Sequence, residues 1–291
     1  MTQRNWFARL GDVVFGAHPA GAPKGRPQVM GIVNVTPDSF SDGGRLGTVA
    51  AATAHALQLL DQGADVVDIG GESTRPGAEP VNAAEEIGRV VPVIKAIRAQ
   101  RSGAVISIDT MKSDVARAAV AAGAAVWNDV TALTRSADSV AVAAELGCDL
   151  ILMHMQGEPR TMQAEPHYDD VVAEVRDWLA ARAQAAMAAG VARERIWLDP
   201  GIGFGKTAAH NLALTAHLDQ LTALGFPVLY AASRKRTIEA VDPTATAPMD
   251  RLGGSLALAL EGARRGAAMV RVHDVRETVQ ALKIQAAVAG A

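Results

Sequence analysis

Eight short apolar runs, separated by stretches with helical patterns, constrain the fold of this chain more than any other feature. The runs mostly lack polar alternation, which is typical of parallel strands buried on both faces. They are Val29–Val33, Val66–Ile69, Val105–Ile108, Ala125–Trp127, Leu150–Met153, Ile196–Leu198, Val228–Tyr230 and Met269–Val272. The clearest helical pattern between them runs from Asp169 to Met187, with Gly190 predicted as its C-cap. Ser113 is a predicted N-cap for the helix after the third run.

Strand–helix alternation repeated eight times predicts an α/β fold, a single TIM (β/α)8 barrel over residues 28–291. The chain has 291 residues, and such a barrel needs about 250. A doubly wound open sheet is the alternative. Residues 1–27 are predicted as a short N-terminal extension, with a hairpin at the barrel bottom as one option.

Charge and cysteine content limit the classes of partner. The formal net charge of −3 does not favour nucleic acid binding, and no apolar stretch approaches the roughly 18 residues needed to span a membrane. The single cysteine allows no intrachain disulfide, which favours a cytoplasmic protein. Two charged pairs, Glu85-Glu86 and Arg264-Arg265, are expected on exposed helix faces.

A polar residue or a turn-forming cluster follows each apolar run. These positions begin at Asn34, Gly70, Asp109, Asn128, His154, Asp199, Ser233 and His273. In a barrel, the carboxyl ends of the strands converge on one mouth, where catalytic residues are found. Helix capping explains one or two such residues, but not carboxylates, amides and cations at nearly every strand end.

The chemistry of these strand-end residues divides into two groups. Asp109, Asn128 and Asp199 offer acceptors suited to a flat heterocycle with several N–H donors. The second group, suited to a phosphate or diphosphate, consists of Arg75, Lys235, Arg271 and His273. Asn34 offers an amide oxygen to Mg²⁺, which is usually shared with substrate phosphates.

Two motifs have alternative interpretations, as a nucleotide-binding loop and as a zinc ligand. The segment from Pro200 to Thr207 is rich in glycine, but it lacks the first glycine of a P-loop and the last glycine of a dinucleotide fingerprint. We expect this loop to let the backbone approach a ligand closely. His154 follows a strand without a second histidine or cysteine at metal-ligand spacing, so a hydrogen-bonded buried histidine is favoured over a zinc ligand.

Taken together, the strand-end segments resemble the dihydropteroate synthase family, which joins a pterin to para-aminobenzoate. The matching segments are Met30–Gly44, Gly71–Gly77, Ser107–Thr110, Asn128–Val130, Met153–Gly157, Asp199–Lys206, Ser233–Lys235 and Arg271–Val275. They follow one another in the family's order from about residue 29 to the end of the chain.

The resemblance implies a TIM barrel that binds 6-hydroxymethyl-7,8-dihydropterin diphosphate. By motif, the pterin contacts would be Asp109, Asn128, Met153, Asp199, Phe204 and Lys235. Arg271 and His273 would hold the diphosphate, and Asn34 would contact Mg²⁺. The resemblance also implies a homodimer.

For the second substrate, the resemblance points to two loops and one helix start. Thr74 and Arg75 match the family's substrate-contacting pair, while Phe40, Asp42 and Pro76 would approach para-aminobenzoate. The expected catalytic residues are Asp42, Arg75 and Lys235.

The chain departs from the family pattern after Lys235. Arg236 stands where the family usually has a serine, so that residue and Thr237 are expected at the helix start that would receive the aminobenzoate carboxylate. Two other functions remain open: a methyltransferase that holds a reduced folate in a related barrel, and a non-catalytic pterin-binding barrel.

Overall fold

A computed structural model describes residues 25–35, 44–73, 80–158 and 161–291, with the backbone alone for residues 44–48. Its strands coincide with the predicted apolar runs to within one or two residues. They are β1 (Gln28–Asn34), β2 (Val66–Gly70), β3 (Val105–Asp109), β4 (Val126–Asp129), β5 (Asp149–Met153), β6 (Ile196–Asp199), β7 (Leu229–Tyr230) and β8 (Met269–Val272). The predicted extension, residues 1–27, lies almost wholly outside the described residues.

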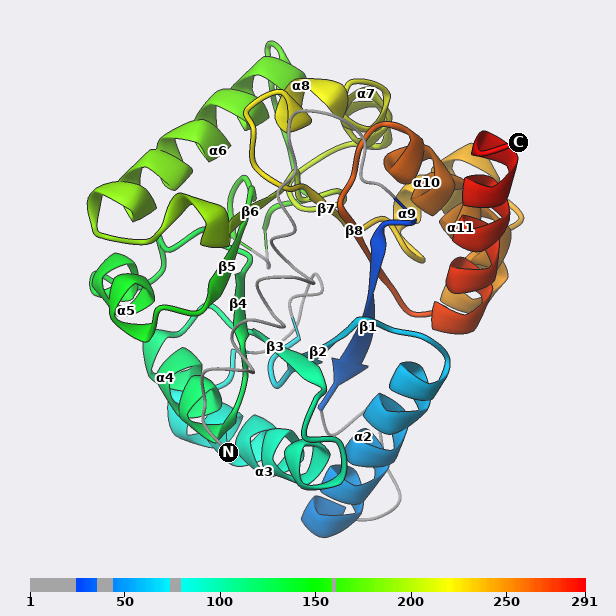
Figure 1. The fold of residues 1–291 in the computed structure, drawn as a ribbon. Coiled ribbons are helices and arrows are strands. Elements are labelled where there is room, and N and C mark those ends of the chain that lie inside the picture. The colour runs from blue at the N-terminus through cyan, green and yellow to red at the C-terminus, as the bar shows by residue number, and fades with distance from the viewer. Residues whose placement is uncertain (1–24, 36–43, 74–79, 159–160) are drawn as a thin grey trace.

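The strands form one parallel sheet that closes on itself. Their order is β6-β5-β4-β3-β2-β1-β8-β7, and every neighbouring pair is parallel. A parallel bridge between Leu198 and Val228 joins the β6 end of this sheet to the β7 end. Figure 1 shows the strands as a ring with the helices around it. The predicted TIM barrel is therefore confirmed, and the open doubly wound sheet is wrong.

Helices cover the outside of the barrel (Figure 1). They are α2 (Gly44–Asp61), α3 (Ala83–Gln100), α4 (Ser113–Ala122), α5 (Ser139–Leu146), α6 (Val171–Ala188), α7 (Ala208–Ala216), α8 (Asp219–Thr222), α9 (Arg236–Val241), α10 (Leu252–Arg264) and α11 (Val275–Ala289), with 3-10 turns at Arg193–Arg195 and Pro248–Arg251. Across the described ranges, we find no helix with the length and apolar character needed to cross a membrane.

Two predicted helix caps are displaced by one residue. Helix α4 has Lys112 at its N-cap, because the Ser113 hydroxyl donates to Asp138 at 2.6 Å and does not cap the helix. The C-cap of α6 is Ala189, and the predicted Gly190 follows it with φ +106°. A glycine one position past the cap is the common way for a helix to end.

The barrel interior changes from apolar to polar toward the carboxyl ends of the strands. An apolar layer near the bottom is built from Met30, Val66, Val126, Ile151, Trp197, Leu229 and Met269. Because side chains on one face of a strand recur every second residue, the next inward positions follow two residues later. Those positions are Ile32, Asp68, Asn128, Met153, Asp199, Ala231 and Arg271. Strand periodicity therefore places several charged side chains just above an apolar base.

Candidate active site

A network of charged and polar side chains, buried or half-buried, forms the floor of the barrel mouth. Arg271 on β8 donates from Nε to Asp68 at 2.6 Å and from Nη2 to Asp109 at 2.8 Å. The Asn128 side-chain amide donates to the same Asp68 oxygen at 3.1 Å. The fold thus brings together three residues predicted for the site, namely Asp109, Asn128 and Arg271.

Asp68 belongs to this network and was missed in the sequence. Its side chain is fully buried on β2, inside the apolar run Val66–Ile69, whereas the site residues are predicted at the positions that follow each run. The available signal was a carboxylate at the inward position two residues after Val66. Asp68 contacts the side chains of two site residues, Arg271 and Asn128, so it is a positioning residue of the floor.

Burial shifts the protonation of both predicted pterin-binding carboxylates. It raises the pKa of Asp109 to about 7, although the neighbouring Arg271 guanidinium opposes the shift. Burial likewise raises the pKa of Asp199 to about 6, opposed first by the Gly201 N–H and then by Lys235. Both carboxylates therefore change charge close to neutral pH, which is common at functional sites.

The opposite wall of the site joins β5, β6 and the segment after β7. Asp199 accepts a 2.7 Å hydrogen bond from the Gly201 amide. The Lys235 Nζ lies 4.1 Å from the centre of the Phe204 ring, a cation–π contact. Burial, followed by the charge of Arg271, lowers the pKa of Lys235 to about 8. Met153 is buried at the end of β5.

The residues expected on the anion side lie at the ends of β1 and β8. Ser233 Oγ lies 3.1 Å from His273 Nδ1, and the His273 amide donates to the same hydroxyl at 3.2 Å. Burial and then the positive charge of Arg234 lower the pKa of His273 to about 3. His273 is therefore a neutral hydrogen-bond donor and adds no positive charge to the site. Asn34 is half-buried, and its amide oxygen lies near Gly70.

The two residues expected at the helix start after Lys235 have different surroundings. Arg236 is exposed at the first position of α9. Thr237 is buried, and its hydroxyl accepts a 2.9 Å hydrogen bond from Asn211. Five further predicted residues lie outside the described part of the chain: Phe40, Asp42, Thr74, Arg75 and Pro76.

The glycine-rich loop after β6 packs against the backbone of the loop after β5. Gly201 has φ +67°, and a Cβ there would overlap the carbonyl oxygen of His154. At Gly205, with φ +60°, a Cβ would overlap the carbonyl oxygen of Gln156. These glycines therefore allow a close approach to a second loop of the protein itself, whereas the predicted approach to a ligand stays a prediction. His154 is buried and hydrogen-bonded, as predicted.

Replacing Gly201 with alanine is expected to destabilise the protein by at least about 2 kcal/mol, because the left-handed backbone and the overlap with His154 both oppose a Cβ. Urea unfolding measures this change. The control is Gly253→Ala in α10, where a Cβ would meet nothing within 4 Å, and a gain of about 0.5–1 kcal/mol is expected. Equal stability of the Gly201→Ala and wild-type proteins would contradict the prediction.

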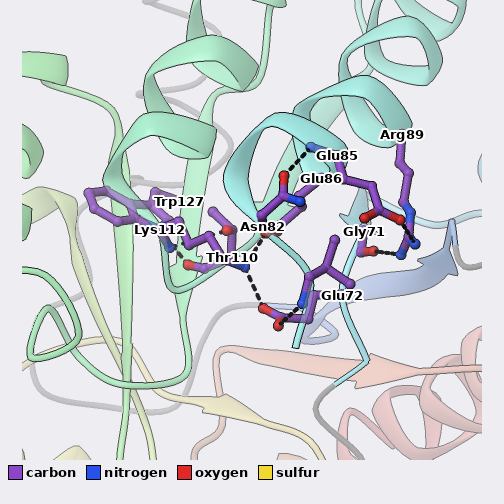
Figure 2. Close-up of polar contacts among 10 residues, drawn as sticks. Gly71, Glu72, Asn82, Glu85, Glu86, Arg89, Thr110, Lys112 and Trp127 are labelled. Carbon is purple, nitrogen blue, oxygen red and sulfur yellow. Dashed lines mark hydrogen bonds and ion pairs between the residues drawn. The ribbon is translucent and has the colours of Figure 1, made fainter. Parts of the chain in front are cut away.

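A second polar cluster lies at the junction of β2, β3 and α3 (Figure 2). The Lys112 ammonium donates to Glu72 at 2.7 Å and to Glu86 at 2.6 Å. The second carboxylate oxygen of Glu72 accepts from the Val81 amide at 3.0 Å. Glu72 and Lys112 thus connect the end of β2, the residues before α3 and the start of α4.

The expectation that Glu85-Glu86 forms an exposed helix face is wrong for Glu86. Glu85 is exposed and accepts from Arg89 at 2.5 Å, whereas the Glu86 side chain is fully buried. Burial raises the pKa of Glu86, and the hydrogen bond from Lys112 opposes that shift. Adjacent helix positions point in different directions, and only the packing of α3 on the barrel decides which of the two is covered.

Replacing Lys112 with methionine is expected to lower the free energy of unfolding by about 2 kcal/mol, because Glu86 loses its counter-charge. The double variant Lys112→Met/Glu86→Gln should recover much of that loss, since a neutral amide is cheaper to bury. Urea unfolding of the complete double-mutant cycle measures the coupling, and Glu85→Gln serves as the exposed control. Additive effects of the two substitutions on the free energy of unfolding would contradict the pairing of Lys112 with Glu86.

Comparison with known proteins identifies the family. The family described as "Pterin binding enzyme" matches residues 30–273. The dihydropteroate synthase of Escherichia coli (strain K12) is 46% identical over 258 residues, which are 89% of this chain and 90% of that protein.

Solved structures agree with this match. The structure of Xanthomonas albilineans dihydropteroate synthase with 4-aminobenzoic acid has 52% sequence identity and a TM-score of 0.86, covering 91% of this chain and 94% of that one. The Yersinia pestis dihydropteroate synthase in complex with a sulfonamide drug has 45% identity and a TM-score of 0.85, covering 91% and 95%. The chain therefore belongs to the pterin-binding enzymes, and within them to the dihydropteroate synthase family.

Proposed function

We propose that the chain condenses 6-hydroxymethyl-7,8-dihydropterin diphosphate with para-aminobenzoate to give 7,8-dihydropteroate and diphosphate, as a transferase of folate biosynthesis. The observation that carries this function is the buried floor of the barrel mouth. There, the Arg271 guanidinium binds Asp109 directly, and it is connected to Asn128 through Asp68. Such a floor offers acceptors to a donor-rich ring while keeping its charges paired.

Pterin recognition would use the two carboxylates in their ionised form. A carboxylate accepts two parallel hydrogen bonds from an amidine-like edge, as it does from arginine. Asp199 and Asp109 would accept the N–H donors of the ring, with Asn128 beside them. Met153 and the Phe204 ring would line the apolar faces, and Lys235, already on the Phe204 ring, would lie over the pterin.

The reaction breaks the bond between the exocyclic carbon of the pterin and the diphosphate oxygen, and the bonding electron pair leaves with the diphosphate. The pterin ring shares the positive charge that develops on that carbon. The aromatic amine then forms the new carbon–nitrogen bond and loses a proton. Arg271 and His273 would donate hydrogen bonds to the leaving diphosphate, which stabilises its developing charge.

Residues on the first two loops would handle the second substrate. We assign Phe40 and Pro76 to the aminobenzoate ring, and Thr74 and Arg75 to substrate contacts, on the motifs that carry them. Asp42 would stabilise the cation or accept the amine proton. Full activity of an Asp42→Ala protein at saturating substrates would remove that role.

Magnesium is the proposed cofactor, held by Asn34. That side chain accepts no hydrogen bond from the residues described. Its amide oxygen and the Asp109 carboxylate both lie close to Gly70. One amide oxygen from the protein suits Mg²⁺, which keeps several waters and takes further ligands from substrate phosphates. When bound, the ion neutralises diphosphate charge and so favours its departure.

A coupled assay for diphosphate release tests the proposed function. Release that requires Mg²⁺, the pterin diphosphate and para-aminobenzoate together is the expected result. Pterin binding without turnover would favour the non-catalytic barrel, and methyl transfer from a reduced folate would favour the methyltransferase. Neither the methyltransferase nor the non-catalytic barrel needs Lys235, Arg271 and His273 together.

Sulfonamides are expected to inhibit the enzyme, because they mimic para-aminobenzoate and the segment Gly71–Glu79 carries no insertion beside Pro76. Inhibition should be competitive, so added para-aminobenzoate should restore the rate. Initial rates over a matrix of the two concentrations measure this. Unchanged rates at a sulfonamide concentration far above that of para-aminobenzoate would refute the expectation.

We further propose that the protein acts as a cytoplasmic homodimer. Two exposed apolar side chains of α11, Ile284 and Val288, support a subunit contact on that side of the barrel. Light scattering during size-exclusion chromatography distinguishes a dimer from a monomer.

A further inference from the structure

Lys206 is a buried lysine for which the proposed reaction has no direct use, and burial lowers its pKa to about 7. It is 2% exposed and directly precedes Thr207, the N-cap of α7. Its Nζ lies 2.9 Å from His154 Nδ1 and donates to the carbonyl oxygens of His154, Gly201 and Phe204 at 3.3, 3.1 and 3.0 Å. Within the described ranges, no carboxylate pairs with this ammonium, so backbone carbonyls and one ring nitrogen surround it.

The acceptors around Lys206 come from two different loops. His154 belongs to the loop after β5, whereas Gly201 and Phe204 belong to the loop after β6. Burial and then the charge of Lys206 lower the pKa of His154 to about 3, so its ring stays neutral and offers a lone pair at Nδ1. Without the ammonium, three converging carbonyl oxygens would be left buried without this donor, which is costly.

One of the two loops that Lys206 joins, the loop after β6, forms part of the pterin site. The Gly201 amide donates to Asp199, and the carbonyl of the same residue accepts from Lys206. Phe204 also accepts from Lys206 through its carbonyl, while its ring contacts the Lys235 ammonium. The position of Lys206 is therefore connected to the Asp199 carboxylate and to the Phe204 ring through single residues.

We propose that Lys206 is a positioning residue of the pterin subsite. Its ammonium locks the loop after β6 against the loop after β5, and so holds Asp199 and the Phe204 ring in place for the pterin. The inference rests on the proposed function, because it takes those two residues as pterin contacts. Lys206 itself lies beneath the loop and would not touch either substrate.

The test compares Lys206→Met, which keeps an unbranched side chain but removes the charge and the donors, with Lys95→Met at an exposed site on α3. The KM for each substrate, kcat and the Kd for the pterin diphosphate are measured. In Lys206→Met, the KM and Kd for the pterin diphosphate should rise at least about tenfold, because small displacements of binding groups are costly. The KM for para-aminobenzoate should stay within about twofold, since its contacts are assigned to other loops. Lys95→Met should match the wild type.

A purely structural role would give a different pattern. A folded Lys206→Met protein whose two KM values match the wild type would overturn the proposal, whatever its kcat. Should this variant fail to fold, Lys206→Gln replaces it, because the amide keeps two N–H donors without the charge. A smaller rise in the KM for the pterin diphosphate is then expected, and an unchanged value overturns the proposal. Absence of diphosphate release in both the wild type and Lys95→Met would instead refute the proposed function.

Discussion

Replacement of Arg271 with methionine is expected to lower kcat/KM by about a thousandfold or more and to destabilise the protein by about 3–5 kcal/mol. Arg271 is bound at once to Asp68 and to Asp109, and Asp68 is fully buried. Without the guanidinium, two carboxylates that point into the barrel lose their counter-charge. The pKa of Asp109 should then rise further, so that its ionised, pterin-binding form becomes scarce at neutral pH.

The variant Arg271→Lys distinguishes the effect of the positive charge from that of the guanidinium geometry. Arg271→Lys keeps the positive charge but cannot donate to two carboxylates through one planar group. We expect it to recover much of the lost stability and little of the lost activity, because the orientation of Asp109 depends on the bond from Nη2.

Urea unfolding and diphosphate release measure the two effects of Arg271→Met separately. The matched control is Arg101→Met, which breaks an arginine–carboxylate pair with Asp61 whose side chains are 49% and 60% exposed. Such an exposed pair contributes less than about 1 kcal/mol, so this variant should retain full activity. An Arg271→Met enzyme within tenfold of wild-type kcat/KM, or as stable as wild type, would contradict the charge-pairing account of the floor.

The second large effect is expected at Asp199, where asparagine should weaken pterin diphosphate binding by about a hundredfold or more. The amide keeps the shape of the carboxylate and one oxygen for the Gly201 N–H, but it replaces the second acceptor oxygen with an NH2 donor and removes the charge. Since burial raises the pKa of Asp199 to about 6 and that of Asp109 to about 7, wild-type affinity should fall as pH decreases through 7 and 6. Asp199→Asn should lose the step near 6.

The stability of the protein without substrate should depend on pH in the opposite sense. Burial raises the folded pKa of Asp199 to about 6, above the usual value of an aspartate, so its stabilising contribution is complete at low pH and is lost as pH rises through about 6. An asparagine cannot ionise and escapes that loss. The melting temperature of Asp199→Asn relative to wild type should therefore increase between pH 5 and pH 8.

Calorimetric titration with the pterin diphosphate and thermal melts across this pH range test both statements. Asp219→Asn, at an exposed position in α8, is the control and should follow the wild type in both measurements. Pterin affinity in Asp199→Asn equal to that of the wild type would exclude Asp199 as a pterin contact. A constant difference in melting temperature would show that Asp199 is ionised throughout the range.

Strand-end chemistry was predictable because the barrel topology brings distant strand ends together. Asp109, Asn128 and Asp199 follow apolar runs, and closure of the sheet gathers them at one mouth. Asp68 was hidden inside an apolar run, although strand periodicity was enough to find it. The contact between Lys206 and His154 was not predictable, because it depends on how two loops pack after their strands end.

The sequence by itself determined the barrel, the order of its strands and the residue types at their carboxyl ends, because hydrophobic periodicity and chain connectivity are local properties. Only the tertiary structure decided which charges pair. It placed Arg271 between Asp68 and Asp109, buried Glu86 beside Lys112, and left His273 neutral. Those outcomes depend on burial and on distances between side chains far apart in the chain, since the energy of a buried charge is set by its immediate surroundings.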